Sequence, residues 1–163
     1  MKILMTLETP FPPDKRVENE IEVLVSAGYD VHLICLESQK ETEYLFKSLK
    51  IHYLSPSTFI RKSSVGALRF PFYFNYWKKE IRKLLKVNNF DLLHIHDLPL
   101  IKPMYELKKQ FSFKIVLDLH ENWPGLLSVS PYTKSVAGKL LCSIKEWKDY
   151  ERRYVKKANK IIV

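Results

Sequence analysis

Ionisable side chains gather at the ends of two apolar runs in the sequence. The runs DLLHIHD and KIVLDLH carry, at or next to their last positions, His96, Asp97, Asp118 and His120. Histidine exchanges a proton near neutral pH, and residues two apart on a strand share a face, so Asp118 can orient the His120 ring. These residue types can position a hydroxyl-bearing substrate or move a proton.

Metal ligation is an alternative use of the same residues, since a His-x-His pair on a strand projects both rings to one face. That ligand set comprises His94, His96, Asp118 and His120. However, no further histidine or cysteine pair completes the set on a neighbouring loop, and His94 also fits a buried, hydrogen-bonded histidine. Cys35 and Cys142 lack metal-ligand spacing and lie in apolar surroundings, which indicates reduced, buried thiols. We therefore expect no bound metal and no cofactor.

The runs that carry these residues alternate with helical patterns along the whole chain. The patterns predict strands at 2–6, 30–36, 50–55, 91–97, 114–120 and 160–163, and helices at 17–25, 40–49, 66–87, 100–110 and 133–158. Gly28 is expected to end the first helix, and Pro71 to interrupt the third. Strands that are apolar on both faces and separated by helices indicate α/β architecture, a doubly wound Rossmann-like parallel sheet with helices on both faces, in the order 3-2-1-4-5-6.

In such a sheet, ligands bind beyond the carboxyl ends of the strands, where the strand order reverses. The segments after strands one, four and five are therefore the candidate site. The four glycines lie far apart, and none stands in the turn after strand one, which excludes dinucleotide and P-loop phosphate binding.

Length and charge place further bounds on the protein. The 163 residues fit one domain, 1–163, and because the chain ends within the apolar run KIIV we expect it to be cut from a longer protein. The longest stretch without Asp, Glu, Lys or Arg is 122–133, only 12 residues, which is too short to span a bilayer. The apolar start is too short for a secretory signal, so we expect a cytoplasmic protein.

Three blocks carry a resemblance to a known family: PPDKRVENEIEVLVSAGYDVHLICL, FDLLHIHDLPL and VLDLHENWP. Their order and spacing resemble the amino-terminal, acceptor-side domain of the family 4 glycosyltransferases of the GT-B fold. The resemblance implies a retaining, metal-independent enzyme that moves a sugar from a nucleotide donor to a sugar or lipid-linked acceptor. It also implies that a carboxy-terminal donor-binding domain, with its Glu-x7-Glu motif, is absent from this chain. The Gly-Gly turn that many members carry after strand one is absent as well.

The resemblance assigns roles to individual residues. His120 matches the family histidine that faces the donor sugar, and Asp118 would orient it, so these two are the expected catalytic residues. The expected substrate-binding residues are Arg16, Asn19, Glu20, His96, Asp97, Glu121 and Asn122. Glu121 and Asn122 are equally suited to satisfy free N–H groups of the following helix, and Arg16 to lie in solvent.

Residues 61–86 hold eight basic residues against one acidic residue, Glu80, with six aromatic residues interleaved, within a chain of net charge +9. This pattern favours contact with an anionic membrane surface through Arg69, Trp77, Lys78, Lys79, Arg82 and Lys83. The alternative is a helix whose aromatic face packs on the sheet and whose basic face is solvated. No nucleic-acid-binding motif accompanies the charge, so nucleic acid is not an expected partner.

Together these observations predict the acceptor-side domain of a retaining glycosyltransferase in cell-surface polysaccharide assembly, attached peripherally to the inner face of the membrane. Its partners would be a nucleotide-sugar, a sugar or lipid-linked acceptor and the missing carboxy-terminal domain, and we expect the isolated domain to be inactive. Two alternatives stay open: a non-catalytic membrane-recruiting subunit of a two-chain enzyme, and a nucleotide-sugar epimerase domain.

Overall fold

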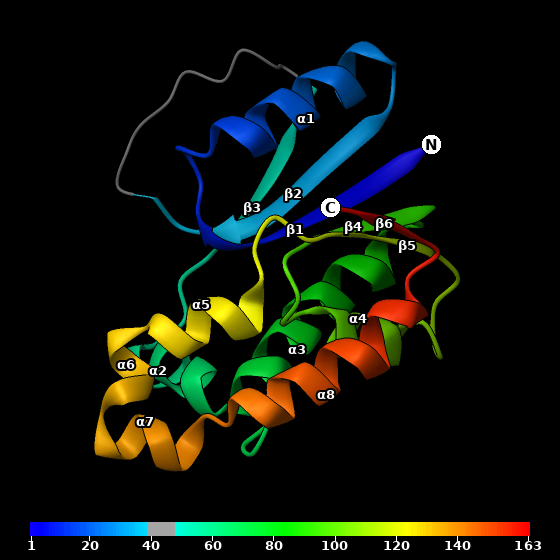
Figure 1. Cartoon of the computed structure of the whole chain (residues 1–163). Coiled ribbons are helices and arrows are strands. Elements are labelled where there is room, and N and C mark those ends of the chain that lie inside the picture. Colours follow the sequence, from blue (N-terminus) through cyan, green and yellow to red (C-terminus); the bar gives the residue numbers. More distant parts are fainter. Residues whose placement is uncertain (39–47) are drawn as a thin grey trace.

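A computed structural model of the chain describes residues 1–38 and 48–163 (Figure 1). The helix expected at 40–49 lies almost wholly outside the described residues. The described part forms one sheet with helices packed on both of its faces (Figure 1).

Six strands make the sheet, in the order β3-β2-β1-β4-β5-β6, and each neighbouring pair is parallel. The strands are β1 (Lys2–Pro10), β2 (Asp30–Leu36), β3 (Lys50–Leu54), β4 (Leu92–His96), β5 (Lys114–Asp118) and β6 (Lys160–Ile162). This confirms the predicted fold class and strand order. The first strand runs four residues further than predicted, to Pro10, since its end still pairs with Leu36 of β2 beyond a register shift.

Helix α1 (Lys15–Ser26) covers one face of the sheet. It begins where the Asp14 side chain accepts hydrogen bonds from two backbone N–H groups of the first turn. Its buried residues Val17 and Ile21 join the apolar side chains of β1 and β2 that point to this side. As predicted, Gly28 follows the end of the helix, in the left-handed conformation at φ +80°, where a side chain would be strained.

The opposite face is covered by α3 (Phe72–Val87), α4 (Ile101–Leu107) and α8 (Ile144–Tyr154) (Figure 1). Helix α3 turns a stripe of large side chains toward the core, at the three- and four-residue spacing of one helix face. The stripe consists of Tyr73, Phe74, Trp77, Ile81 and Leu85. Tyr150 ties α8 to the start of α4, since its hydroxyl donates to the Pro99 carbonyl at 2.6 Å and accepts from the Lys102 N–H at 3.0 Å.

The two longest predicted helices are wrong in their extent. In place of a helix from residue 66, the chain forms α2 (Thr58–Lys62) and a 3-10 turn, η1 (Ser63–Gly66), and α3 begins only after Pro71. The predicted interruption at Pro71 is confirmed, since proline lacks the N–H that a continuing helix needs.

The helix predicted at 133–158 is instead a series of short helices, preceded by α5 (Trp123–Val129). The series is α6 (Pro131–Lys134), α7 (Val136–Leu141), α8 and the 3-10 turn η2 (Val155–Lys157). Serine side chains cap two of these starts: Ser135 accepts from the Gly138 N–H and Ser143 from the Glu146 N–H. Serine competes in this way with the helix backbone, so each such residue begins a new helix.

Both cysteines, Cys35 and Cys142, are free and buried, as the sequence predicted. Burial raises the pKa of the Cys35 thiol to about 12, so this thiol stays protonated. Within residues 1–38 and 48–163, none of the helices combines the length and the apolar character that crossing a bilayer requires.

Replacing Trp77 by alanine should lower the free energy of unfolding by about 3–5 kcal/mol, because this fully buried ring fills the core between α3 and the sheet. Urea denaturation measures the change. Lys79→Ala, at an exposed position of the same helix, is the control and should change stability by less than about 0.5 kcal/mol. A loss below about 1 kcal/mol for Trp77→Ala would contradict the packing of α3.

Candidate functional site

Three histidines and two carboxylates meet on the α1 face of the sheet. Strands β4 and β5 pair in parallel with His96 opposite Asp118, so alternate residues of both strands point to the same side. The side chains that share this side are His94, His96, Asp118 and His120. Helix α1 lies over them and contributes Glu20, which the sequence analysis had named for substrate binding but had not placed among the histidines. We call these five residues the histidine cluster.

Asp118 is the centre of the histidine cluster, and only 2% of its side chain is exposed. Its Oδ2 lies 2.9 Å from Nε2 of His120 and 3.7 Å from Nε2 of His94. Glu20 approaches from the other side, with Oε2 3.6 Å from Nε2 of His96 and Oε1 3.8 Å from Nε2 of His120. Asp118 is close enough to His120 to orient its ring, which stays a prediction, and Glu20 is a second carboxylate in the cluster.

Burial sets the protonation of the histidine cluster. Burial, with the Asp118 charge beside it, raises the pKa of Glu20 to about 7. Burial and the neighbouring His94 lower the pKa of His96 to about 3, so this ring is neutral at neutral pH. Burial opposes ionisation of Asp118, but contact with His94 and the nearby His120 and His96 rings outweigh it, and the pKa of Asp118 lies below its usual value. The pKa of Glu20 is therefore raised, whereas Asp118 stays ionised at neutral pH.

The same cluster contains the residues best placed to hold a metal ion in the described part of the chain. Donor atoms of Glu20, His94, His96 and Asp118 lie within 4.8 Å of one another. The metal-ligand alternative raised from the sequence had lacked a donor outside the two strands, and Glu20 of α1 is such a donor.

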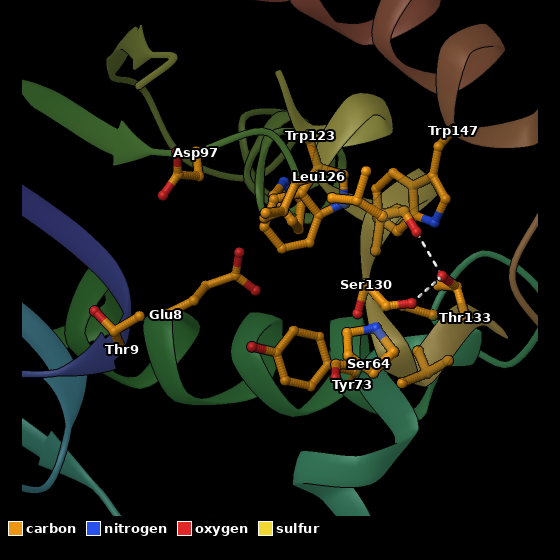
Figure 2. A pocket seen from close by; sticks show the side chains of 16 residues that line it. Glu8, Thr9, Ser64, Tyr73, Asp97, Trp123, Leu126, Ser130, Thr133 and Trp147 are labelled. Atoms are coloured by element: carbon orange, nitrogen blue, oxygen red, sulfur yellow. Dashed lines mark hydrogen bonds between the residues drawn. The ribbon is translucent and has the colours of Figure 1, made fainter. Parts of the chain in front are cut away.

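A hollow lies on the face of the sheet opposite the histidine cluster, between β1, α3 and α5 (Figure 2). Its volume is about 540 Å³. Glu8 and Thr9 from β1 and Asp97 from the end of β4 stand on one side (Figure 2). The remaining wall is largely apolar and includes Val65, Ala67, Tyr73, Pro99, Trp123, Leu126, Leu127, Val129, Pro131 and Trp147. We call this hollow the aromatic pocket.

Two carboxyl groups form the polar side of the aromatic pocket. Burial raises the pKa of Glu8 to about 8, against a hydrogen bond from the Tyr73 hydroxyl that favours the ionised form. Asp97 adopts φ +66°, a left-handed conformation that aspartate tolerates better than most residues, and its N–H donates to the Asp118 carbonyl at 2.8 Å. Burial and the Glu121 charge raise the pKa of Asp97.

The sequence analysis named Asp97 but missed the other residues of this pocket. Glu8 was not recognised because the first strand was expected to stop at Thr6, whereas the observed strand carries Glu8 on the face of α3. Period-2 alternation continued past Thr6 would have placed Glu8 there. Tyr73 and Trp147 had only the signal of aromatic residues at helical spacing, which a packed core shares.

Four other predicted substrate-binding residues occupy different positions. Asn19 lines a hollow of about 570 Å³ that also reaches Glu20 and His120. Arg16 is half exposed and pairs with Asp14 at 3.3 Å, so a carboxylate already occupies the start of α1. Asn122 caps α5, since its Oδ1 accepts from the Gly125 N–H at 2.9 Å. This is the alternative given in the sequence analysis, in which Asn122 satisfies a free N–H group of the following helix. Glu121 is exposed beside it.

The expected membrane-contact residues are only partly available at the surface. Trp77 is fully buried, so its assignment to membrane contact is wrong: the aromatic face of α3 packs on the sheet. Three of the basic residues are paired with acids, namely Arg69 with Glu146, Lys78 with Glu106 and Lys83 with Glu80. Lys79 is exposed and Arg82 half-buried.

The fold and its carboxyl-edge hollows define one half of a GT-B glycosyltransferase. The chain belongs to glycosyltransferase family 4, whose family model matches residues 15–163. No curated protein matches the chain in sequence.

Solved structures share the fold at low sequence identity. Sucrose-phosphate synthase from Thermosynechococcus elongatus matches 99% of this chain with a TM-score of 0.58 and 14% identity. UGT2 from Phytolacca americana, complexed with UDP-2-fluoro-glucose and pterostilbene, matches 98% with a TM-score of 0.56 and 13% identity. The chain spans 47% of the length of each. These likenesses confirm the fold.

Glu8→Gln should change how stability depends on pH. The folded protein keeps the Glu8 proton up to a pKa of about 8, whereas the unfolded chain releases it near 4.5, so the wild type loses stability as pH rises between these values. The glutamine variant lacks this loss. Its free energy of unfolding should therefore exceed that of the wild type by an amount that grows with pH to at most about 5 kcal/mol at pH 9, at roughly 1.4 kcal/mol per pKa unit. Urea denaturation at pH 5 and pH 9 measures it.

Glu22→Gln, at an exposed position of α1, is the control and should show no such pH-dependent advantage. Equal stability of Glu8→Gln and wild type at both pH values would show that Glu8 is ionised and solvated in the folded protein.

Proposed function

We propose that the chain is the acceptor-side half of a retaining glycosyltransferase that moves a sugar from a nucleotide-sugar to a sugar or lipid-linked acceptor in cell-surface polysaccharide assembly. The single observation that carries the proposal is the convergence of the His120–Asp118 contact and the aromatic pocket on the carboxyl ends of β1, β4 and β5. Ligands of open parallel sheets bind at this edge. Family membership supports the transfer of a glycosyl group.

His120 and Asp118 would act as a unit in this reaction. Oδ2 of Asp118 lies 2.9 Å from Nε2 of His120, close enough to orient the ring toward a sugar hydroxyl. Closure of a donor-binding domain over this edge would bring the acceptor hydroxyl to the anomeric carbon. The new glycosidic bond then forms as the bond to the diphosphate breaks, and the hydroxyl proton passes to the departing diphosphate. No side chain of this chain is required as a nucleophile.

We propose that transfer requires no metal and no other cofactor. The resemblance to family 4 glycosyltransferases, which implies a metal-independent enzyme, supports this proposal.

The test uses a protein that contains both this chain and a donor-binding domain. In it, His120→Ala should lower kcat by roughly 100-fold or more, as does the loss of one preorganised polar group near developing charge. The rate is measured as release of nucleoside diphosphate in the presence of the nucleotide-sugar and the acceptor. His52→Ala, on β3 outside both hollows, is the control. The product should keep the donor's anomeric configuration, and dialysis against EDTA should leave the rate unchanged.

Wild-type turnover of a folded His120→Ala protein would remove this residue from the site, and loss of activity in EDTA would overturn metal independence. The 163 residues alone should transfer no sugar. Transfer by them alone would contradict the need for a second domain. Formation of free, altered nucleotide-sugar without an acceptor would favour an epimerase instead.

We also propose that the protein works at the cytoplasmic face of an anionic membrane, through a surface that differs from the predicted one. Segments 56–79 and 122–145 contain no acidic residue and eight basic ones. The structure brings them together, since Arg69 donates to the Leu140 carbonyl and Gly66 lies against Leu141. Large apolar side chains are exposed on this end, built from α2, η1, α6 and α7 (Figure 1): Phe59, Phe70, Phe72, Val136 and Leu140. Exposed rings among basic residues, of which Arg69 and Lys78 are paired with Glu146 and Glu106, suit an anionic bilayer.

Replacing Phe59 and Phe72 together by serine should weaken binding to phosphatidylglycerol-rich vesicles by at least about tenfold, because insertion of each ring removes apolar surface from water. Vesicle sedimentation measures the affinity, and binding should fall further as salt screens the basic residues. Val87→Ser, at an exposed apolar position outside these segments, is the control. Undiminished sedimentation of the double variant would refute this membrane surface.

A further inference from the structure

The lining of the aromatic pocket indicates a class of acceptor that the family assignment leaves open. We infer that it binds amphiphilic acceptors: an aromatic or prenyl-like apolar body against Trp123 and Leu127, and a hydroxyl end against Glu8 and Asp97. This inference rests on the proposed function, because it takes the pocket as the acceptor site, and it narrows the proposed sugar or lipid-linked acceptor to one that carries an apolar group.

The apolar side of the pocket is built from rings that the core holds in place. Trp123 and Trp147 meet edge to face with their centroids 5.9 Å apart, and Trp147 and Tyr73 are buried. Leu126, Leu127 and Val129 of α5 complete this wall. A volume of about 540 Å³ lies within the range of drug-sized ligand sites, which are lined mainly by apolar and aromatic side chains.

The polar groups of the pocket are concentrated on one side. Oε2 of Glu8 and Oδ1 of Asp97 are buried, and neither has a hydrogen-bond partner within residues 1–38 and 48–163. Buried polar atoms are normally satisfied, so two unpaired oxygens mark the place for a donor such as an acceptor hydroxyl. The Trp123 Nε1–H, also buried and unpaired in this part of the chain, is available to an oxygen at the junction of the two parts of the ligand.

The opposite side offers few free partners to a second sugar ring. The Thr133 hydroxyl donates to the carbonyls of Leu127 and Ser130, and the Ser64 hydroxyl donates to the Arg61 carbonyl (Figure 2 shows Ser64, Ser130 and Thr133 together). A sugar placed there would lose hydrogen bonds to water without replacing them, whereas an apolar group loses nothing. The pocket therefore favours a hydroxyl at one end and hydrocarbon at the other.

Matched glucosides test the inference without any donor. 1-Naphthyl glucoside and methyl glucoside share the sugar and differ only in the attached group. Titration calorimetry should show that the naphthyl compound binds at least tenfold more tightly, with quenching of the tryptophan emission. Leu127→Asp, which places a charge in the apolar wall, should weaken naphthyl glucoside binding at least tenfold, and Val87→Asp, at an exposed position away from the pocket, should leave it unchanged.

Circular dichroism establishes that each variant is folded, and Leu126→Asp, at a position already 43% exposed, replaces Leu127→Asp if the latter unfolds. Equal affinity for the two glucosides, or undiminished naphthyl binding to a folded wall variant, would overturn the inference. Because no transfer is measured, this outcome is distinct from failure of the proposed function. A transferase that used methyl and naphthyl glucosides equally would retain the function and lose the inference.

Discussion

The burial of ionisable groups at the carboxyl edge of a parallel sheet is the constraint on which the rest of this structure depends. A carboxylate such as Asp118, almost wholly out of water, is tolerated only where partners offset its lost hydration. Three histidine rings surround Asp118, with Nε2 of His120 2.9 Å from its Oδ2, and their proximity lowers the pKa of Asp118. The register that sets His96 opposite Asp118 brings these groups together. The pairing of β4 with β5 therefore places the ionisable groups of the site.

Strand alternation divides the edge into two environments. On the α1 face, β4 and β5 present histidines and Asp118, and α1 supplies Glu20. On the α3 face, β1 presents Glu8 to a wall of aromatic rings. The first environment is suited to hydrogen bonding and proton sharing, and the second to apolar contact.

The short helices α5 to α7 link this edge to the end of the molecule that carries the proposed membrane surface. Asn122 begins α5 directly after β5, so the wall of the aromatic pocket follows at once from the strand that carries Asp118. Ser135 and Ser143 cap the starts of α7 and α8, and α7 exposes Val136 and Leu140. The aromatic pocket and the proposed membrane surface thus share one stretch of chain.

The sequence by itself determined the architecture and half of the site. Apolar strand runs separated by helices specify a parallel sheet, and strand-end residues such as His120 and Asp118 follow from where those runs stop. Tertiary structure alone decided what crosses between elements: that Glu20 joins the histidines, that Trp77 lies in the core and not at a membrane, and that Glu8 faces Trp123 and Trp147. Local patterns report periodicity and caps, but they do not report which faces meet. That depends on the packing of segments far apart in the chain, where burial in the core overrides local propensity.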